Sequence, residues 1–297
     1  KGHLDQERKN LQSTRIDILD DFFPSKEKDK TFDCLSFIIE SPSQFKEGLS
    51  YSDQTGRFPF ASSRGHEYFY VLYNYDANAI LVEPIKNRKA ATLVEAWEKT
   101  HRRLTQNGHK VNTYILDNEF SGDLKYALEE ANITYQLVPP GQHRRNAAER
   151  AIRTFKNHFL SCLATCHPSY PIREWDRLVP QVELTLNLLR TSRINPTLSA
   201  WTYLFGQYNF SKTPMAPLGT KILIHEKSDK RKSWDFHGKD GYYVGPALQH
   251  YRCIRAYLPK TRAERVTDTA SFIPSHIPFP EANLDDHLQA TRKKLIH

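Results

Sequence analysis

The chain has 297 residues, which is enough for two average domains and a packed core. Apolar residues make up 39%, and 12 glycines bring the total close to the globular norm of about 45–50%, which excludes wholesale disorder. Forty-two Lys and Arg against 34 Asp and Glu give a net charge of +8, which favours polyanionic partners. The chain contains no run of roughly 18 apolar residues, and its first twenty positions are rich in charge, so we expect a soluble protein without a signal peptide.

The sulfur-containing residues give two further expectations. The cysteines at 34, 162, 166 and 253 form neither the paired CxxC motifs of a zinc site nor the regularly spaced set of a small disulfide-rich secreted domain. This pattern favours a reducing compartment. The only methionine is Met215 and the chain begins with Lys1, so we expect a segment of a longer polyprotein.

The first half of the chain predicts an α/β domain after a polar arm at 1–46. Runs rich in Tyr, Val, Ile and Phe predict strands, of which the first three are expected to be antiparallel, and apolar residues at helical spacing predict helices. The expected strands are LSYSD (49–53), EYFYVLYNYD (67–76), AILVEPI (79–85), VNTYILD (111–117) and ITYQLV (133–138), with helices at 89–106 and 123–132. The resulting order is βββαβαβ.

Two long helices and a β-rich region are expected in the second half. One helix is predicted at 146–166 and one at about 172–191, the second with Trp175, Leu178, Val182, Leu186 and Leu189 buried. From residue 215, short β-type runs separated by Gly, Pro and Asp turns predict a small separate barrel. The residues after Pro280 form a charged tail.

Three carboxylates fall at the junctions of these elements. Asp53 ends the first strand, Asp117 ends the fourth, and Glu149 opens the long helix that follows the fifth. If the two strands are neighbours and the helix packs beside them, the three acids converge. Such a cluster repels itself unless hard cations such as Mg²⁺ or Mn²⁺ neutralise it, so convergence would create a two-metal site for phosphodiester chemistry.

Each acid also has an ordinary structural explanation. Asp53 precedes the Thr55-Gly56 turn, and Asp117 can begin an Asx turn with a solvated carboxylate. Asn146 and Glu149 have the spacing of a capping box, in which the glutamate side chain folds back onto the first backbone amide of the helix. The sequence physics leaves both explanations open.

Basic residues near these acids are candidate nucleic-acid contacts. Their alternatives are a solvated helix face with ordinary ion pairs and plain solvated loops. The candidates are Arg145, Arg153 and Lys156 around Glu149, Arg144 with Arg145 in the loop before the helix, and Lys230, Arg231 and Lys232 beside Trp234.

A zinc site on the 146–166 helix is not expected. His158, Cys162 and Cys166 recur every four residues, but eight residues of helix rise about 12 Å, whereas zinc ligands lie within about 2.3 Å of the ion. We therefore expect Cys162 to act as a small packing residue.

Five runs in order resemble the integrase region of copia-type LTR retrotransposon polyproteins. They cover roughly residues 48–275: YSDQTGRFPFASSRGHEY, ILDNEF, NAAERAIRTFKNHF, LNLLRTSRINPTLSAWTYLFG and DGYYVGPALQHYRCIRAYLP. The resemblance implies an RNase H-like core, with a five-stranded mixed sheet flanked by helices, at 47–205, a small β-barrel domain at 206–280 and a charged tail at 281–297.

The resemblance also implies a function and a site. Asp53 of SDQTG, Asp117 of LDNEF and Glu149 of NAAER match the catalytic Asp, Asp, Glu triad, which would bind two Mg²⁺ or Mn²⁺ ions. The implied activity is the processing of cDNA 3′ ends and their joining to target DNA by a metal-dependent polynucleotidyl transferase. A homo-oligomer, no membrane association, and a nuclear location after a cytoplasmic particle stage are also implied.

Two departures from the family keep an alternative open. Thirty-one residues separate Asp117 from Glu149, fewer than the thirty-five that the family usually has, and no His₂Cys₂ zinc module precedes residue 48. We therefore expect no zinc. A catalytically silent DNA-binding derivative is the main alternative, and a ribonuclease with the same core is a third hypothesis.

Overall fold

The structure is a computed structural model that describes residues 48–116, 122–138, 147–226, 234 and 236–273. The predicted arm at 1–46 and the predicted tail at 281–297 lie outside the described residues. In the described part, no helix is both long and apolar enough to cross a membrane.

A five-stranded mixed sheet forms the first half of the described chain. Its strands are β1 (Leu49–Gln54), β2 (Tyr68–Asn74), β3 (Ala79–Ile85), β4 (Thr113–Leu116) and β5 (Thr134–Leu137). The spatial order is β3-β2-β1-β4-β5; β1 to β3 pair antiparallel, whereas β1, β4 and β5 pair parallel. This topology is RNase H-like and confirms the predicted fold class, and the elements follow one another along the chain in the predicted order βββαβαβ.

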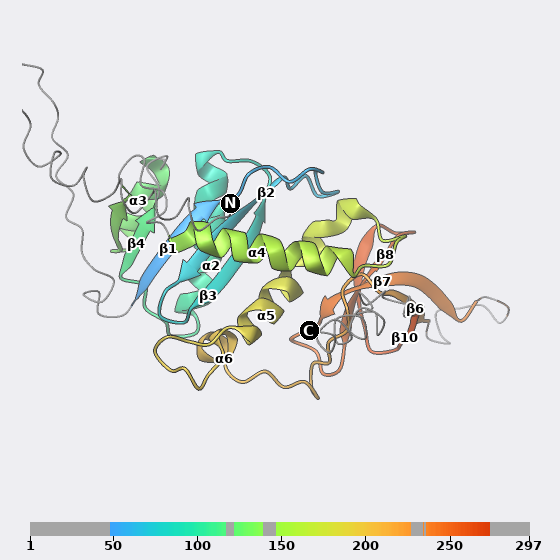
Figure 1. The fold of residues 1–297 in the computed structure, drawn as a ribbon. Coiled ribbons are helices and arrows are strands. Elements are labelled where there is room, and N and C mark those ends of the chain that lie inside the picture. Colours follow the sequence, from blue (N-terminus) through green and yellow to red (C-terminus); the bar gives the residue numbers. More distant parts are fainter. Residues whose placement is uncertain (1–47, 117–121, 139–146, 227–233, 235, 274–297) are drawn as a thin grey trace, which may run out of the picture. The chain divides into compact units, whose positions relative to one another are not determined.

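Helices cover both faces of this sheet (Figure 1). They are α2 (Ala90–Thr105), α3 (Gly122–Glu130), α4 (Ala147–Ala164), the 3₁₀ helix η3 (Ile172–Arg177), α5 (Val179–Leu189) and α6 (Ala200–Phe205). Alternate strand residues face opposite sides. Tyr70 and Leu72 pack with α2, α3 and α6, whereas Phe69 and Val71 pack with α4 and α5.

The predicted helix at 172–191 is wrong in two details. It divides into η3 and α5, and Pro180 at the start of α5 explains the break because proline lacks the N–H that would continue the helix. Leu189, expected to be buried, is 78% exposed. Leu189 is the last residue of α5, and the chain leaves the helix at Arg190, whose backbone is extended.

Side chains of α5 close the outer edge of β3. Asn187 accepts from the Ile80 N–H and donates to the Ile80 carbonyl, each over 2.9 Å, and Glu183 accepts from the Val82 N–H over 2.8 Å. Glu183 is in turn held by Arg103 of α2. These bonds satisfy backbone groups that an edge strand otherwise leaves unpaired.

The β-rich region predicted from residue 215 forms a second sheet, consistent with a C-terminal β domain. It contains β6 (Lys221–His225), β7 (Gly238–Pro246), β8 (Ile254–Leu258), β9 (Ala263–Thr267) and β10 (Ala270–Ile273), in the order β10-β6-β7-β8-β9. Whereas a separate barrel was expected, Ile222 and Tyr243 belong to the same buried cluster as Phe155 and Trp175. The sheet therefore packs directly against the core; the domain boundaries remain predictions.

Replacing Asn187 with Ala should destabilise the protein by about 2–4 kcal/mol, because it leaves a buried N–H and a buried carbonyl of Ile80 without partners. Denaturant unfolding followed by circular dichroism measures the change. Asn157→Ala on the exposed side of α4 is the control and should change the free energy of unfolding by less than about 0.5 kcal/mol. Equal stability of the two variants would contradict the proposed role of Asn187.

Candidate functional site

Asp53 lies near the end of β1, on the sheet face that α4 covers. It is two residues beyond Tyr51, whose side chain packs in the cluster shared with α4, and side chains two apart in a strand lie on one face. Asp53 pairs with Val71 of β2, and its Oδ1 accepts a hydrogen bond from the Gln54 N–H over 2.7 Å. The half-buried carboxylate thus belongs to a paired strand and not to a turn.

Glu149 lies in the first turn of α4 with its side chain exposed. His158 follows nine residues later, half a turn away around the helix, and its Nε2 lies 2.9 Å from Thr185 Oγ1 of α5. Helix α5 packs on β3, and α4 packs on β1 and β2, so the flank of α4 that carries His158 faces α5 and β3. Glu149, half a turn away, lies on the other flank of α4, away from β3. Along the strand order, that flank points toward β4.

Asp117 lies outside the described residues and directly follows Leu116, the last residue of β4. In the parallel pairing of β1 with β4, Leu49 is opposite Thr113 and Tyr51 is opposite Ile115, so partners differ by 64 positions. Asp53 and Asp117 are also 64 positions apart. Among the described residues, no group of three His, Cys, Asp or Glu is placed to hold a metal. Asn146 also lies outside, so the capping alternative for Glu149 stays open.

Two of the predicted basic residues are described in the structure. Arg153 and Lys156 are exposed, and they follow Glu149 at the i+4 and i+7 positions, so the three share a flank of α4. Neither forms an ion pair with a carboxylate of the described part of the chain. Trp234 is 98% exposed, whereas Arg144, Arg145 and Lys230–Lys232 lie outside the described residues.

The loop that follows Asp53 is tied to η3 by contacts that sequence analysis missed. The Trp175 Nε1–H donates to the Phe60 carbonyl over 2.8 Å, and Arg64 Nε donates to Asp176 Oδ2 over 2.8 Å. His66 Nδ1 lies 2.6 Å from the same oxygen. The apolar Trp175 was predicted as buried, but no local pattern pointed to the burial of the neighbouring Asp176.

The same short helix connects to the second sheet. Arg177 bonds to Glu174 within η3, and its Nη1 donates to Glu264 of β9 over 2.8 Å. Arg255 of β8 donates to the other oxygen of Glu264, and the Tyr257 hydroxyl donates to Glu174. Burial alone raises the pKa of Glu264, but the charge of Arg255 and hydrogen bonds from Arg177 and Arg255 lower it overall.

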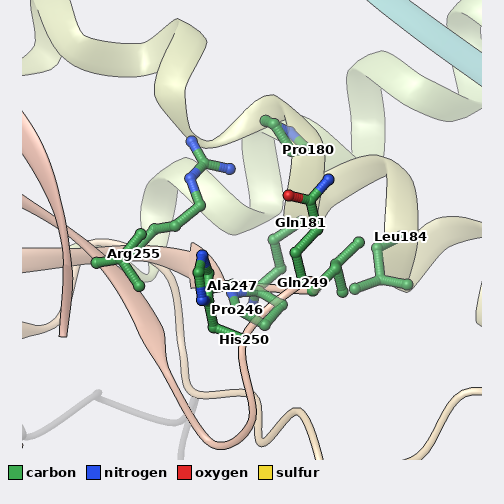
Figure 2. Close-up of a pocket in the computed structure, with 10 residues that line it drawn as sticks. Pro180, Gln181, Leu184, Pro246, Ala247, Gln249, His250 and Arg255 are labelled. Atoms are coloured by element: carbon green, nitrogen blue, oxygen red, sulfur yellow. The ribbon is translucent and has the colours of Figure 1, made fainter. Parts of the chain in front are cut away.

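A pocket of about 300 Å³ lies between α5 and the β7–β8 hairpin (Figure 2). Its lining is mainly apolar, and its charged or titratable members are Arg255 and His250. It contains none of the predicted site residues. Because no carboxylate lines it, this pocket does not offer the oxygen ligands that Mg²⁺ requires.

The thiols of α4 and its C-terminal end behave as packing groups. Cys162 and Cys166 pack against the main core cluster, and the Cys162 Sγ lies 3.9 Å from His158 Nε2. Burial raises the pKa of Cys162, and burial together with Cys162 raises the pKa of Cys166 to about 12. Zinc binds thiolates, so raised pKa values disfavour binding.

Comparisons with known proteins found structural neighbours only: no protein-family model and no curated protein matches the chain. The BIV integrase catalytic core aligns with 54% of this chain and 94% of its own, at 14% identity and a TM-score of 0.39. An HTLV-2 integrase catalytic core in complex with magnesium aligns over 54% of this chain and 98% of its own length, at 17% sequence identity and a TM-score of 0.41. A chain of a simian T-cell lymphotropic virus intasome aligns over 74% of this chain and 76% of its own length, at 14% sequence identity and a TM-score of 0.42. These scores are low, so the fold assignment rests on the strand order.

The buried Asp176 gives a prediction for acid stability. Burial alone raises its pKa, but hydrogen bonds from His66 and Arg64 and the charge of Arg64 lower the pKa overall. Its stabilisation is therefore complete above the unfolded pKa of about 3.9 and disappears as the pH falls through the lower folded pKa. We expect Asp176→Asn to lower the free energy of unfolding by about 2 kcal/mol at pH 7 and by much less near pH 2.

Denaturant melts from pH 7 down to pH 2 measure this difference. Asp240→Asn, at an exposed position of β7, is the matched control and should leave the pH profile unchanged. An Asp176→Asn profile that runs parallel to the wild type at every pH would contradict the assignment.

Proposed function

We propose that the chain is a metal-dependent polynucleotidyl transferase of the integrase class, derived from a copia-type retrotransposon. The observation that carries this proposal is the placement of Asp53 and Glu149. The two residues are 96 positions apart in the sequence, on β1 and α4, and lie on one side of an RNase H-like sheet, toward β4. The register of β1 with β4 supports Asp117 as their third partner.

The donor set fits hard divalent cations. Asp53 and Glu149 offer carboxylate oxygens only, which suits Mg²⁺ or Mn²⁺ and disfavours softer metals. In this proposal Asp53, Asp117 and Glu149 hold two ions, Asp53 and Asp117 sharing one. When bound, such ions activate a water or a 3′ hydroxyl and stabilise the leaving oxygen at a phosphodiester.

The residues of the chain would bind and orient the nucleic acid. Arg153 and Lys156 extend from Glu149 along one flank of α4, where they can neutralise successive phosphates of a DNA strand. Arg144, Arg145 and Lys230–Lys232 remain predicted contacts to DNA. Paired cDNA ends would require a homo-oligomer, and a nuclear site of action follows from the same proposal.

Asp53→Asn and Glu149→Gln should each reduce strand transfer by at least about a hundredfold, because a bound metal supplies several kcal/mol of transition-state stabilisation. The assay joins a labelled duplex end to plasmid DNA in Mg²⁺ and in Mn²⁺. Glu130→Gln, an exposed glutamate of α3, is the control and should retain activity.

Strand transfer that persists in either site variant would overturn the assignment. A wild-type protein that binds DNA in a salt-dependent way but never cuts or joins it would instead support the catalytically silent alternative. A preference for RNA–DNA hybrids would support a ribonuclease.

A further inference from the structure

The chain leaves the first sheet at Thr55, two residues after Asp53. Thr55 is buried, and its N–H donates to the Phe69 carbonyl over 2.9 Å. Its Oγ1 accepts from the Phe69 N–H over 3.0 Å and donates to the Gly56 carbonyl over 2.9 Å. Thr55 thus continues the pairing of β1 with β2 by one residue beyond the end of β1.

Arg88 binds the remaining polar group of Thr55. Its Nη2 donates to the Thr55 carbonyl over 2.5 Å, and its guanidinium carbon lies 5.0 Å from the centroid of the Tyr68 ring. A hydrogen bond from a charged donor is stronger than one between neutral groups, and an aromatic face attracts a guanidinium. The charged end of Arg88 is therefore held by one contact beyond β1 and one contact on β2.

This arginine reaches across a neighbouring strand. It lies in the connection between β3, which ends at Ile85, and α2, which begins at Ala90. In the sheet, β2 separates β3 from β1 (Figure 1), and Tyr68 is the first residue of β2. Arg88 thus passes over Tyr68 and fastens the end of β1 to the connection that follows β3.

The connection that carries Arg88 is itself held by hydrogen bonds. Asn87 Oδ1 accepts from the Lys89 N–H and from Thr92 Oγ1, each over 2.9 Å. An asparagine side chain that binds the backbone two residues ahead forms an Asx turn, which fixes the direction of the chain. Because Arg88 lies inside this turn, its long side chain extends from a fixed point.

The bond from Arg88 lies where the pairing of β1 is least protected. Gln54 is the only residue between Asp53 and Thr55, and the two residues that follow Thr55 are exposed. The ends of paired strands open more readily than their centres because fewer contacts hold them. Loss of the bond from Arg88 would let Thr55 separate first, and the pairs formed by Gln54 and Asp53 are next in line.

We propose that Arg88 is a positioning residue for Asp53 and acts through Thr55. The inference rests on the proposed function, in which the Asp53 carboxylate binds a divalent cation. Groups that hold a metal must stay within about 0.5 Å of their working position, which requires rigid support behind them. By keeping Thr55 paired, Arg88 keeps the backbone of Asp53 in the strand and its carboxylate on the face that α4 covers.

The first test measures the end of the strand in the metal-free protein. Hydrogen exchange reports how often the Thr55 N–H separates from the Phe69 carbonyl. Arg88→Ala should speed the exchange of this amide by about tenfold, because it removes a charge-assisted hydrogen bond. Lys86→Ala removes an exposed cation from the same connection, so it is the matched control and should leave the exchange unchanged.

The second test measures Mn²⁺ binding to the protein without DNA, by electron paramagnetic resonance of the free ion. Arg88→Ala should weaken binding by about tenfold, the usual cost of removing a residue that supports a metal ligand. Arg88→Lys keeps a charged donor but has no planar group to lie on Tyr68, so it should give intermediate affinity. Because no DNA is present, a contact between Arg88 and DNA cannot produce this effect.

A double-mutant cycle connects Arg88 with Asp53. In an Asp53→Asn protein, adding Arg88→Ala should change Mn²⁺ affinity by less than about twofold, because the ligand that it positions is already gone. Tyr68→Leu removes the ring that contacts the guanidinium without touching Thr55, and it should shift both measurements in the same direction as Arg88→Ala. Thermal melts verify that each variant is folded.

Mn²⁺ affinity in Arg88→Ala that equals that of Lys86→Ala would overturn the proposal. This holds even if the Thr55 amide exchanges faster, because Arg88 would then be a structural contact only. An equal loss of affinity with and without the Asp53 carboxylate would also overturn it.

These measurements separate the inference from the proposed function. A wild-type protein that binds Mn²⁺ and gives the expected cycle, but joins no DNA, would refute the proposed function and support the positioning role of Arg88. A wild-type protein that binds no Mn²⁺ would overturn both.

Discussion

The placement of α4 on the sheet depends on a cluster of aromatic rings. The ring centroids of Phe155 and Phe159 in α4 lie 5.1 and 5.4 Å from the ring centroid of Phe69 in β2. The ring centroid of Trp175 in η3 lies 4.8 Å from that of Phe69. Phe58, in the loop after β1, also belongs to this cluster, and its ring centroid lies 4.7 Å from that of Trp175. Interlocking rings resist rotation because any turn of the helix would open voids in a close-packed interior. This packing therefore fixes which flank of α4 carries Glu149.

The short helix η3 joins three parts of the structure. Trp175 belongs to the aromatic cluster, Asp176 holds the loop that follows Asp53, and Arg177 reaches Glu264 in the second sheet. Buried charges are costly unless paired and hydrogen-bonded, so these contacts demand accurate geometry from each partner. The end of β1, the helix bearing Glu149 and the second sheet are consequently anchored to one element of six residues.

Helix α4 gives different chemistry to its buried and exposed sides. The buried side carries Phe155 and Phe159, which pack against the sheet. The exposed side carries an acid followed by cations at i+4 and i+7, an arrangement suited to metal and phosphate together. One residue of helix rotates a side chain by about 100°, so neighbouring positions in the sequence can face the core and the solvent. This arrangement connects a candidate catalytic centre to a candidate DNA surface.

Local sequence patterns determined much of this protein. Runs of β-forming residues predicted the strands, helical spacing predicted α4, and the element order placed Asp53 and Glu149 at the ends of their elements. Tertiary structure alone decided the burial of Asp176 and Glu183, the exposure of Leu189, and the contacts of Arg190 with Tyr73 and of Arg193 with Tyr75. Periodicity reports how a residue faces within its own element. Ion pairs and cation–π contacts between residues about a hundred positions apart arise only when packing brings those elements together.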